Sequence, residues 1–300
     1  MSVGIGKMDI MEKIEVKAPA KINLFLKILN KRDDGYHNIY SWFQAVSLYD
    51  RIVYGKISEA GLRLRHNGPS ILPTDEKNLI IKTAQLMFER FNLNGGLDID
   101  LKKNIPISAG VGGGSSDAAA TIYAIDKLYE LSLSNEKMQE IGQKLGSDVP
   151  FFFSSGQAEI TGRGEIIKNI SIPLNYSLIL IKPKLSISTS ESYSALKRDL
   201  TRSSEIIKLF CYKDFREMIS NLSEIENDFE KGHLESFPIL KKVRTALVNA
   251  GADFVRMSGS GPTIYGLFRN MPEGDDLKQI IRDDWLYYVV KPIILPAWER

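Results

Sequence analysis

The sequence predicts an α+β fold made of two domains. Segments with strand-like alternation of apolar residues and segments with helical spacing both occur, and they do not alternate strictly along the chain. The chain has 300 residues, 43% of them hydrophobic and 25% charged, which suits about two globular domains. A glycine-spaced stretch at residues 156–164 is expected to close the first domain, so we expect domains over residues 1–165 and 166–300.

Composition argues against several classes of partner. The net charge of +2 gives no reason to expect binding to nucleic acid or to an anionic membrane, and no stretch approaches the ~18 apolar residues of a membrane span. The single cysteine, Cys211, permits no internal disulfide. It is expected to be a small buried hydrophobe in a protein of the reducing cytoplasm. Nothing here indicates an oligomeric state.

The first predicted element is a strand over residues 14–29. After Pro19, strict alternation would place the following side chains on opposite faces: Ile22, Leu24, Leu26 and Ile28 on one, and Lys21, Asn23, Phe25 and Lys27 on the other. A turn over residues 31–35 contains Asp and Gly, which favour turns, and more strand is expected to about residue 53.

The next predicted elements are mostly helical. Asn78 is a good cap for a helix over residues 79–91, and a strand over residues 97–101 follows. A helix then starts at the end of a glycine-rich run, with Ser115, Ser116 and Asp117 as its N-terminal residues. Another helix is expected over residues 135–145.

The second half is expected to begin with a strand over residues 176–182. Helices are expected between residues 190 and 249, and a strand over residues 264–268. The aromatic segment over residues 285–298 is interrupted by Lys291, Pro292 and Pro296, so we interpret it as buried strands rather than a membrane span.

The most informative segment is the glycine-rich run, which contains Gly110, Gly112, Gly113 and Gly114 directly before a helix. Glycines allow backbone N–H groups to approach a ligand closely, and a helix start adds unpaired donors and partial positive charge. A phosphate site is therefore plausible, with a flexible tight turn as the alternative. No Lys follows Gly114 as a Walker A loop requires, and Ser115 stands where a dinucleotide-binding loop needs glycine.

This run resembles the ATP-binding loop of the GHMP kinases, and other segments resemble the same family in the same order. They are Pro19-Ala20-Lys21-Ile22-Asn23, Asp34-Gly35-Tyr36-His37, Gly146-Ser147-Asp148-Val149-Pro150 and Gly259-Ser260-Gly261. The resemblance implies a two-domain GHMP-kinase fold with the active site in the inter-domain cleft. It also implies that ATP, as co-substrate, binds Pro106, Ile107, Ser108, Ala109, Gly110, Val111, Gly112, Gly113, Gly114, Ser115 and Ser116. For both serines, helix capping is a further reading.

The resemblance implies that Lys21 and Asp148 are catalytic. Alone, these residues would be interpreted as a solvated lysine and a turn or helix-cap aspartate. The ordinary pKa values of a carboxylic acid and an alcohol differ by about 12 units, so proton transfer before phosphoryl transfer is unfavourable. The loose transition state needs little activation of the nucleophile. We therefore expect Asp148 to orient the acceptor hydroxyl and take its proton late.

The segments with Lys21 and Tyr36 resemble most closely the GHMP kinases that phosphorylate a cytidylyl-linked sugar alcohol on the way to isoprenoids. The resemblance implies that Tyr36 stacks on the base, that His37 hydrogen-bonds its edge and that Tyr193 is a candidate for its other face. Asn23, Gly259 and Ser260 are also implied to bind this small-molecule substrate. Lys77-Asn78-Leu79 departs from the Asp-Asn-Leu of many relatives, so no adenosine contact is carried over there.

Mg²⁺ is expected to accompany ATP, but no carboxylate set identifies its ligands, and the three histidines are too scattered for a zinc motif. Two other functions remain open. A GHMP kinase for homoserine or mevalonate would not need Tyr36 and His37 for a base, and a ligand sensor of the same fold would bind ATP without turnover. A nucleic-acid-binding domain is a distant third.

Overall fold

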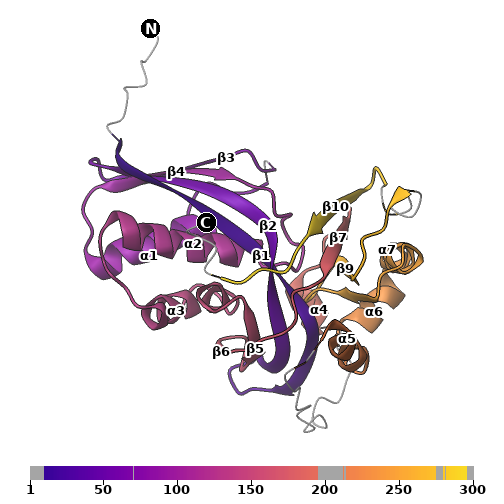
Figure 1. The fold of residues 1–300 in the computed structure, drawn as a ribbon. Coiled ribbons are helices and arrows are strands. Elements are labelled where there is room, and N and C mark those ends of the chain that lie inside the picture. Colours follow the sequence, from indigo (N-terminus) through magenta and orange to yellow (C-terminus); the bar gives the residue numbers. More distant parts are fainter. Residues whose placement is uncertain are drawn as a thin grey trace.

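The computed structural model describes residues 10–69, 71–194, 212, 214–274, 280 and 282–295. It contains two β-sheets, each with helices beside it (Figure 1), which confirms the predicted α+β class. Cys211 and residues 296–298, for which expectations were stated, lie outside the described ranges. Within these ranges, no helix has both the length and the apolar character needed to cross a membrane.

The first sheet has six strands and is built around one long hairpin. Strands β1 (Ile10–Lys31) and β2 (His37–Ile57) pair antiparallel. The rest of the sheet follows the order β3-β4-β2-β5-β6, and its remaining strands are β3 (Gly61–His66), β4 (Gly96–Lys102), β5 (Gln157–Thr161) and β6 (Ile166–Asn169). Helices α1 (Leu79–Phe91), α2 (Gly113–Leu128) and α3 (Asn135–Gln143) lie on one side of this sheet (Figure 1).

The second sheet has four antiparallel strands in the order β10-β7-β9-β8. Its strands are β7 (Ser177–Pro183), β8 (Phe254–Met257), β9 (Ile264–Phe268) and β10 (Trp285–Val290). Its helices are α4 (Thr189–Ser194), α5 (Phe215–Ser223), α6 (Glu230–Ser236) and α7 (Pro238–Asn249). The change of sheet falls between Asn169 and Ser177, and the domain boundary after residue 165 stays a proposal.

Local signals position several elements as expected. The side chain of Asn78 accepts a hydrogen bond from the amide of Ile80 and caps α1, which spans the predicted residues. Strand β9 also has the predicted bounds. Helix α3 ends two residues before the predicted end, at Gln143.

The predicted faces of β1 are wrong beyond Leu24. The register against β2 shifts between Asn23 and Phe25, and such a bulge moves every later side chain to the other face. Phe25 therefore joins Ile22 and Leu24 in one apolar cluster. Leu26 belongs to the other cluster and lines the same pocket as Lys21 and Asn23.

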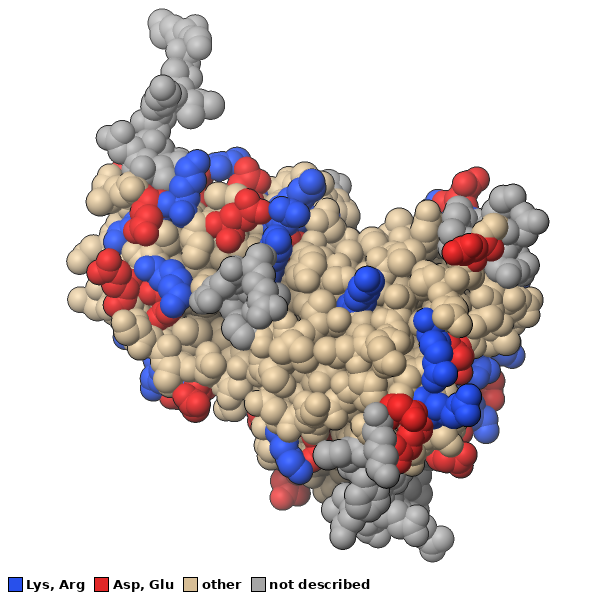
Figure 2. Space-filling model, viewed as in Figure 1, with Lys and Arg blue, Asp and Glu red and all other residues tan. Residues whose placement is uncertain are grey.

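The expectation of buried strands after residue 285 is confirmed only in part: β10 is a strand, and its end residues Trp285 and Val290 are buried. β10 is an edge strand of the second sheet, and Leu286, Tyr287 and Val289 are 51%, 40% and 55% exposed. Figure 2 shows that the broad centre of the face seen in Figure 1 carries few charged side chains. The chain then returns to the first sheet, where the amide of Ile293 donates to the carbonyl of Ala45.

Candidate active site

Two pockets meet at the glycine-rich loop. The first is lined by ten of the eleven residues predicted for ATP, from Pro106 to Ser115, together with Leu72, Pro73, Lys77, Asn78, Leu79, Lys103 and Asp117. The second is lined by Lys21, Asp148 and all six predicted substrate residues, which are Asn23, Tyr36, His37, Tyr193, Gly259 and Ser260. Gly110 and Gly112 line both pockets. We call them the loop pocket and the acceptor pocket.

The helix that follows the loop starts earlier than predicted. The N-cap of α2 is Gly112, with φ of 72° and no side-chain capping bond, so the serines do not cap it. Ser115 lines the loop pocket, whereas Ser116 is fully buried and lies outside the pocket lining. The first amides of α2, at residues 113–115, have no acceptor within the helix. They therefore bring unpaired donors and the positive end of the helix dipole to this pocket.

The loop is packed too closely to be only a flexible turn. A Cβ on Gly110 would lie 2.5 Å from the carbonyl oxygen of Ser258, and one on Gly112 would lie 2.8 Å from Cγ of Lys21. Both glycines have positive φ, 73° and 72°, which side chains with a Cβ disfavour. The Ser258 hydroxyl donates to the carbonyl of Gly110 at 2.9 Å. The segment before Gly259 therefore holds the loop in place.

Lys21 is buried and held by several partners at the edge of the acceptor pocket. Its Nζ lies 3.1 Å from a carboxylate oxygen of Asp148 and 2.7 Å from the side-chain oxygen of Asn23. It also lies 4.0 Å from the ring centre of Phe43. The Lys21 side chain is 5% exposed and that of Asp148 is 32% exposed. The carboxylate therefore remains open to a ligand while the ammonium group stays fixed behind it.

Asp148 occupies the N-cap position of a short helix but does not cap it through its side chain. That helix is the 3₁₀ helix η1 (Val149–Phe153). The five residues of η1 are all buried, so the backbone behind Asp148 is anchored in the core. The structure thus brings Lys21 and Asp148, far apart in sequence, to the junction of the two pockets.

Aromatic side chains occupy another part of the acceptor pocket. The rings of His37 and Tyr193 are stacked, with centres 5.2 Å apart and planes inclined by 16°. The ring of Tyr36 is 58% exposed and lies under the guanidinium of Arg163 at 5.0 Å. Burial lowers the pKa of His37, and the charge of Lys31 adds to this. Burial, with the charge of Asp148, raises the pKa of Tyr193 to about 12.

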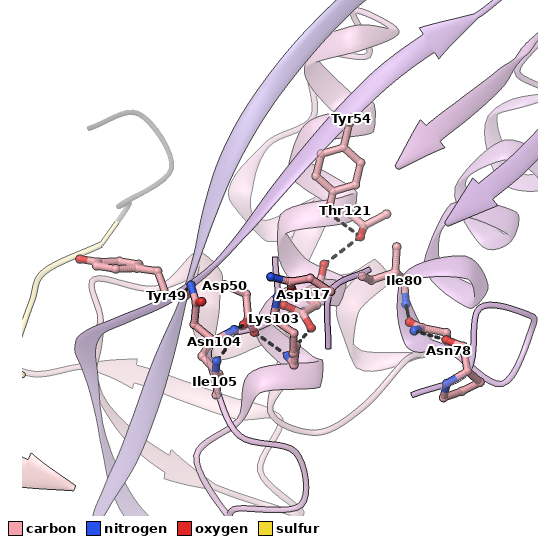
Figure 3. Close-up of polar contacts among 12 residues, drawn as sticks. Tyr49, Asp50, Tyr54, Asn78, Ile80, Lys103, Asn104, Ile105, Asp117 and Thr121 are labelled. Carbon is pink, nitrogen blue, oxygen red and sulfur yellow. Dashed lines mark hydrogen bonds and ion pairs between the residues drawn. The ribbon is translucent and has the colours of Figure 1, made fainter. Parts of the chain in front are cut away.

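A buried ionic cluster under the loop pocket was missed by the sequence analysis. Figure 3 shows Lys103 between Asp50 and Asp117, with Nζ–carboxylate distances of 2.5 and 2.6 Å. All three side chains are at most 5% exposed. Asp50 also accepts the backbone amides of Asn104 and Ile105, at 2.6 and 2.8 Å. The cluster therefore ties the residues just before the loop to the helix just after it.

The loop pocket also includes Lys77, Asn78 and Leu79, the segment to which no adenosine contact was carried over. The Asn78 side chain caps α1.

In the described part of the chain, no three His, Cys, Asp or Glu side chains come together as a metal-binding group.

Comparisons with known proteins agree with this arrangement. The chain matches the models of the GHMP kinases N terminal domain over residues 78–156 and of the GHMP kinases C terminal domain over residues 203–285. It is 43% identical to 4-diphosphocytidyl-2-C-methyl-D-erythritol kinase from Macrococcus caseolyticus (strain JCSC5402), over 83% of this chain and 88% of that protein.

Two solved structures show that the fold alone does not distinguish kinases of different substrates. A crystal structure of 4-(cytidine 5'-diphospho)-2C-methyl-D-erythritol kinase gives a TM-score of 0.73 at 32% identity, covering 93% of this chain and 99% of that one. The homoserine kinase from Cytophaga hutchinsonii ATCC 33406 gives the same TM-score at 18% identity, covering 97% and 98%. The fold is thus common to both, and sequence identity separates them. The chain belongs to the GHMP kinases and, within them, to the family of 4-diphosphocytidyl-2-C-methyl-D-erythritol kinases.

Proposed function

We propose that this protein transfers the γ-phosphoryl group of ATP to the 2-hydroxyl of 4-diphosphocytidyl-2-C-methyl-D-erythritol, a step of the methylerythritol phosphate pathway of isoprenoid biosynthesis. Relatives with that name are 36–43% identical over most of the chain. The observation that carries the proposal is the Lys21–Asp148 pair, 3.1 Å apart, beside the two glycines that line both pockets.

ATP is proposed to occupy the loop pocket, with its phosphates at the amides that begin α2. Those amides and the helix dipole favour phosphate charge. Leu72, Pro73 and Leu79 line the same pocket and offer apolar surface for the adenine. A Mg²⁺ ion is proposed to arrive with ATP and neutralise phosphate charge, since it keeps several waters and needs few protein carboxylates. The Ser115 hydroxyl, which lines the loop pocket, is the candidate protein ligand.

At the junction, Asp148 is proposed to accept a hydrogen bond from the acceptor hydroxyl and to take its proton as the new O–P bond forms. Lys21 is proposed to stabilise the negative charge on the transferring group, because a fixed cation needs no reorganisation during the reaction. Asn23 positions Lys21 through its side-chain oxygen. Gly110 and Gly112 let the loop pack closely against Ser258 and Lys21, since a Cβ at either position would be obstructed there.

The acceptor is proposed to bind with its cytosine at Tyr36, His37 and Tyr193. The exposed Tyr36 ring offers a stacking surface, worth about 1–3 kcal/mol per base, and a neutral His37 offers one donor and one acceptor to the base edge. Gly259 and Ser260 line the same pocket near Asn23. Homoserine and mevalonate carry no base and would leave these rings unused. A cytoplasmic location is part of this proposal and is supported by the single cysteine.

The test is turnover of ATP with Mg²⁺ in a panel of acceptors: the cytidylyl methylerythritol, homoserine, mevalonate, galactose and none. Phosphorus NMR of the product shows whether a phosphate monoester has formed on the acceptor. A new monoester with the cytidylyl compound alone is expected. Turnover only with another alcohol contradicts the proposed acceptor, and tight ATP binding without turnover on any acceptor indicates a sensor.

A further inference from the structure

Two cations of the acceptor pocket have no part in the chemistry described so far. Lys31 is the last residue of β1, and Arg163 lies in the turn between β5 and β6. Both line the acceptor pocket, as do Tyr36 and His37. Because the two segments are far apart in sequence, no local motif accounts for this pair of positive charges.

In the described ranges, neither Lys31 nor Arg163 forms an ion pair with Asp or Glu. Arg163 also interacts electrostatically with Asp34. The ion pair of Asp34, however, is with Arg32, at 3.1 Å. Unpaired cations that line a concave site favour an anionic ligand.

The charge of the pocket lining is correspondingly uneven. Among its side chains, Lys21, Lys31 and Arg163 are cationic, and Asp148 is the one carboxylate. Lys21 and Asp148 pair with each other. The remaining positive charge lies beside the residues proposed for the base, because the Arg163 guanidinium is 5.0 Å from the Tyr36 ring centre.

We propose that Arg163, assisted by Lys31, binds the diphosphate that joins the cytidine of the acceptor to its sugar alcohol. This inference rests on the proposed function, in which the base occupies the Tyr36 side of the pocket. The diphosphate is joined to the base through one ribose, so it must lie within about the length of that sugar from the base. A guanidinium presents a planar set of donors that matches phosphate oxygens, and an ammonium adds a point charge. The competing interpretation is that Arg163 only supports the Tyr36 ring.

The experiment compares binding of cytidine and cytidine diphosphate by calorimetry, with the loop pocket saturated by a non-hydrolysable ATP analogue. Arg163→Gln is expected to weaken cytidine diphosphate about tenfold or more, because charged hydrogen bonds contribute more than neutral ones. Cytidine binding should change less than twofold. The matched control is Lys168→Gln, which removes one positive charge from the adjacent strand β6, where the side chain is 76% exposed.

Equal weakening of both ligands by Arg163→Gln overturns the diphosphate subsite, because it means that Arg163 acts through Tyr36. Unchanged affinity for both ligands overturns it as well. The acceptor panel for the wild-type protein tests the proposed function independently of this binding experiment. If cytidine diphosphate binding depends on Arg163 but another alcohol is phosphorylated, the proposed function fails while the anion subsite stands.

Discussion

The ammonium nitrogen of Lys21 lies 3.1 Å from the carboxylate of Asp148. Lys21 lies in the middle of β1, and Asp148 directly precedes η1. Lys21 is also fixed by Asn23 and by the ring of Phe43. Such a buried, preorganised cation beside a more exposed carboxylate suits phosphoryl transfer, in which positioning and charge stabilisation supply most of the catalysis.

Replacing Lys21 with Met should remove this charge while preserving the length of the side chain. We expect kcat to fall by about 10²–10³-fold, the usual loss on removal of one preorganised electrostatic contact. The KM values for ATP and acceptor should change much less, because the contact strengthens mainly in the transition state. Steady-state kinetics measure both. Near-normal kcat in Lys21→Met would show that Lys21 is not catalytic.

The loop glycines should differ sharply in their tolerance of alanine. Gly110→Ala places a Cβ 2.5 Å from a backbone oxygen at φ of 73°, and we expect it to lower the free energy of unfolding by roughly 1–3 kcal/mol. Gly114→Ala meets nothing within 4 Å and lies inside α2, so stability should be unchanged or rise by up to about 1 kcal/mol. Urea denaturation of both variants checks this, and equal stabilities would mean that the loop is not packed as described.

The Asp50–Lys103–Asp117 cluster should make stability depend on pH. Burial raises the pKa of Asp117, and Asp50 acts in the same direction although Lys103 opposes it. Between the ordinary and the raised pKa we therefore expect the folded state to hold a proton that the unfolded state releases. The stabilisation is fully present below the ordinary carboxyl pKa of about 4 and is lost as pH rises through the raised value, with a slope of up to about 1.4 kcal/mol per pH unit.

Asp117→Asn should flatten this profile because the amide does not titrate. Urea denaturation at several pH values measures the slope. Asp100→Asn, at an exposed position on β4, serves as the control and should retain the wild-type slope. Identical profiles for wild type and Asp117→Asn would show that Asp117 stays ionised in the folded protein.

Tyr36→Ala should act on the acceptor alone. Loss of a stacking surface worth about 1–3 kcal/mol raises KM for the cytidylyl substrate by roughly 5- to 150-fold, whereas KM for ATP should not change. Tyr287→Ala removes a comparable exposed ring from β10, outside both pockets, and should leave both constants unchanged. An unaltered acceptor KM in Tyr36→Ala would remove the argument for base stacking.

Local signals explain what could be predicted from the sequence. The Asn78 cap and the spacing that follows it define α1, because both depend on residues within one helix. The glycine run predicts a phosphate-binding helix start for the same reason. The faces of β1 beyond Leu24 could not be predicted, since the bulge between Asn23 and Phe25 depends on pairing with β2. Alternation in β1 carries no sign of it.

The missed residues are those whose partners lie on other elements. Asp50, Lys103 and Asp117 come from β2, the segment after β4 and α2, and only the fold shows that one lysine bridges two carboxylates. Arg163 has no motif around it that distinguishes it from a surface arginine. Arg163 lies within the glycine-spaced stretch at residues 156–164, but such spacing predicts a turn and not a ligand site.

Transfer at the Lys21–Asp148 pair is tested most directly by kcat for the cytidylyl methylerythritol in Asp148→Asn. The amide keeps the shape but accepts a proton poorly, so we predict a loss of about 10²–10⁴-fold, with ATP and acceptor still bound at near wild-type affinity by calorimetry. A kcat within a few fold of wild type, with both substrates bound, would contradict the proposal that transfer takes place at the Lys21–Asp148 pair.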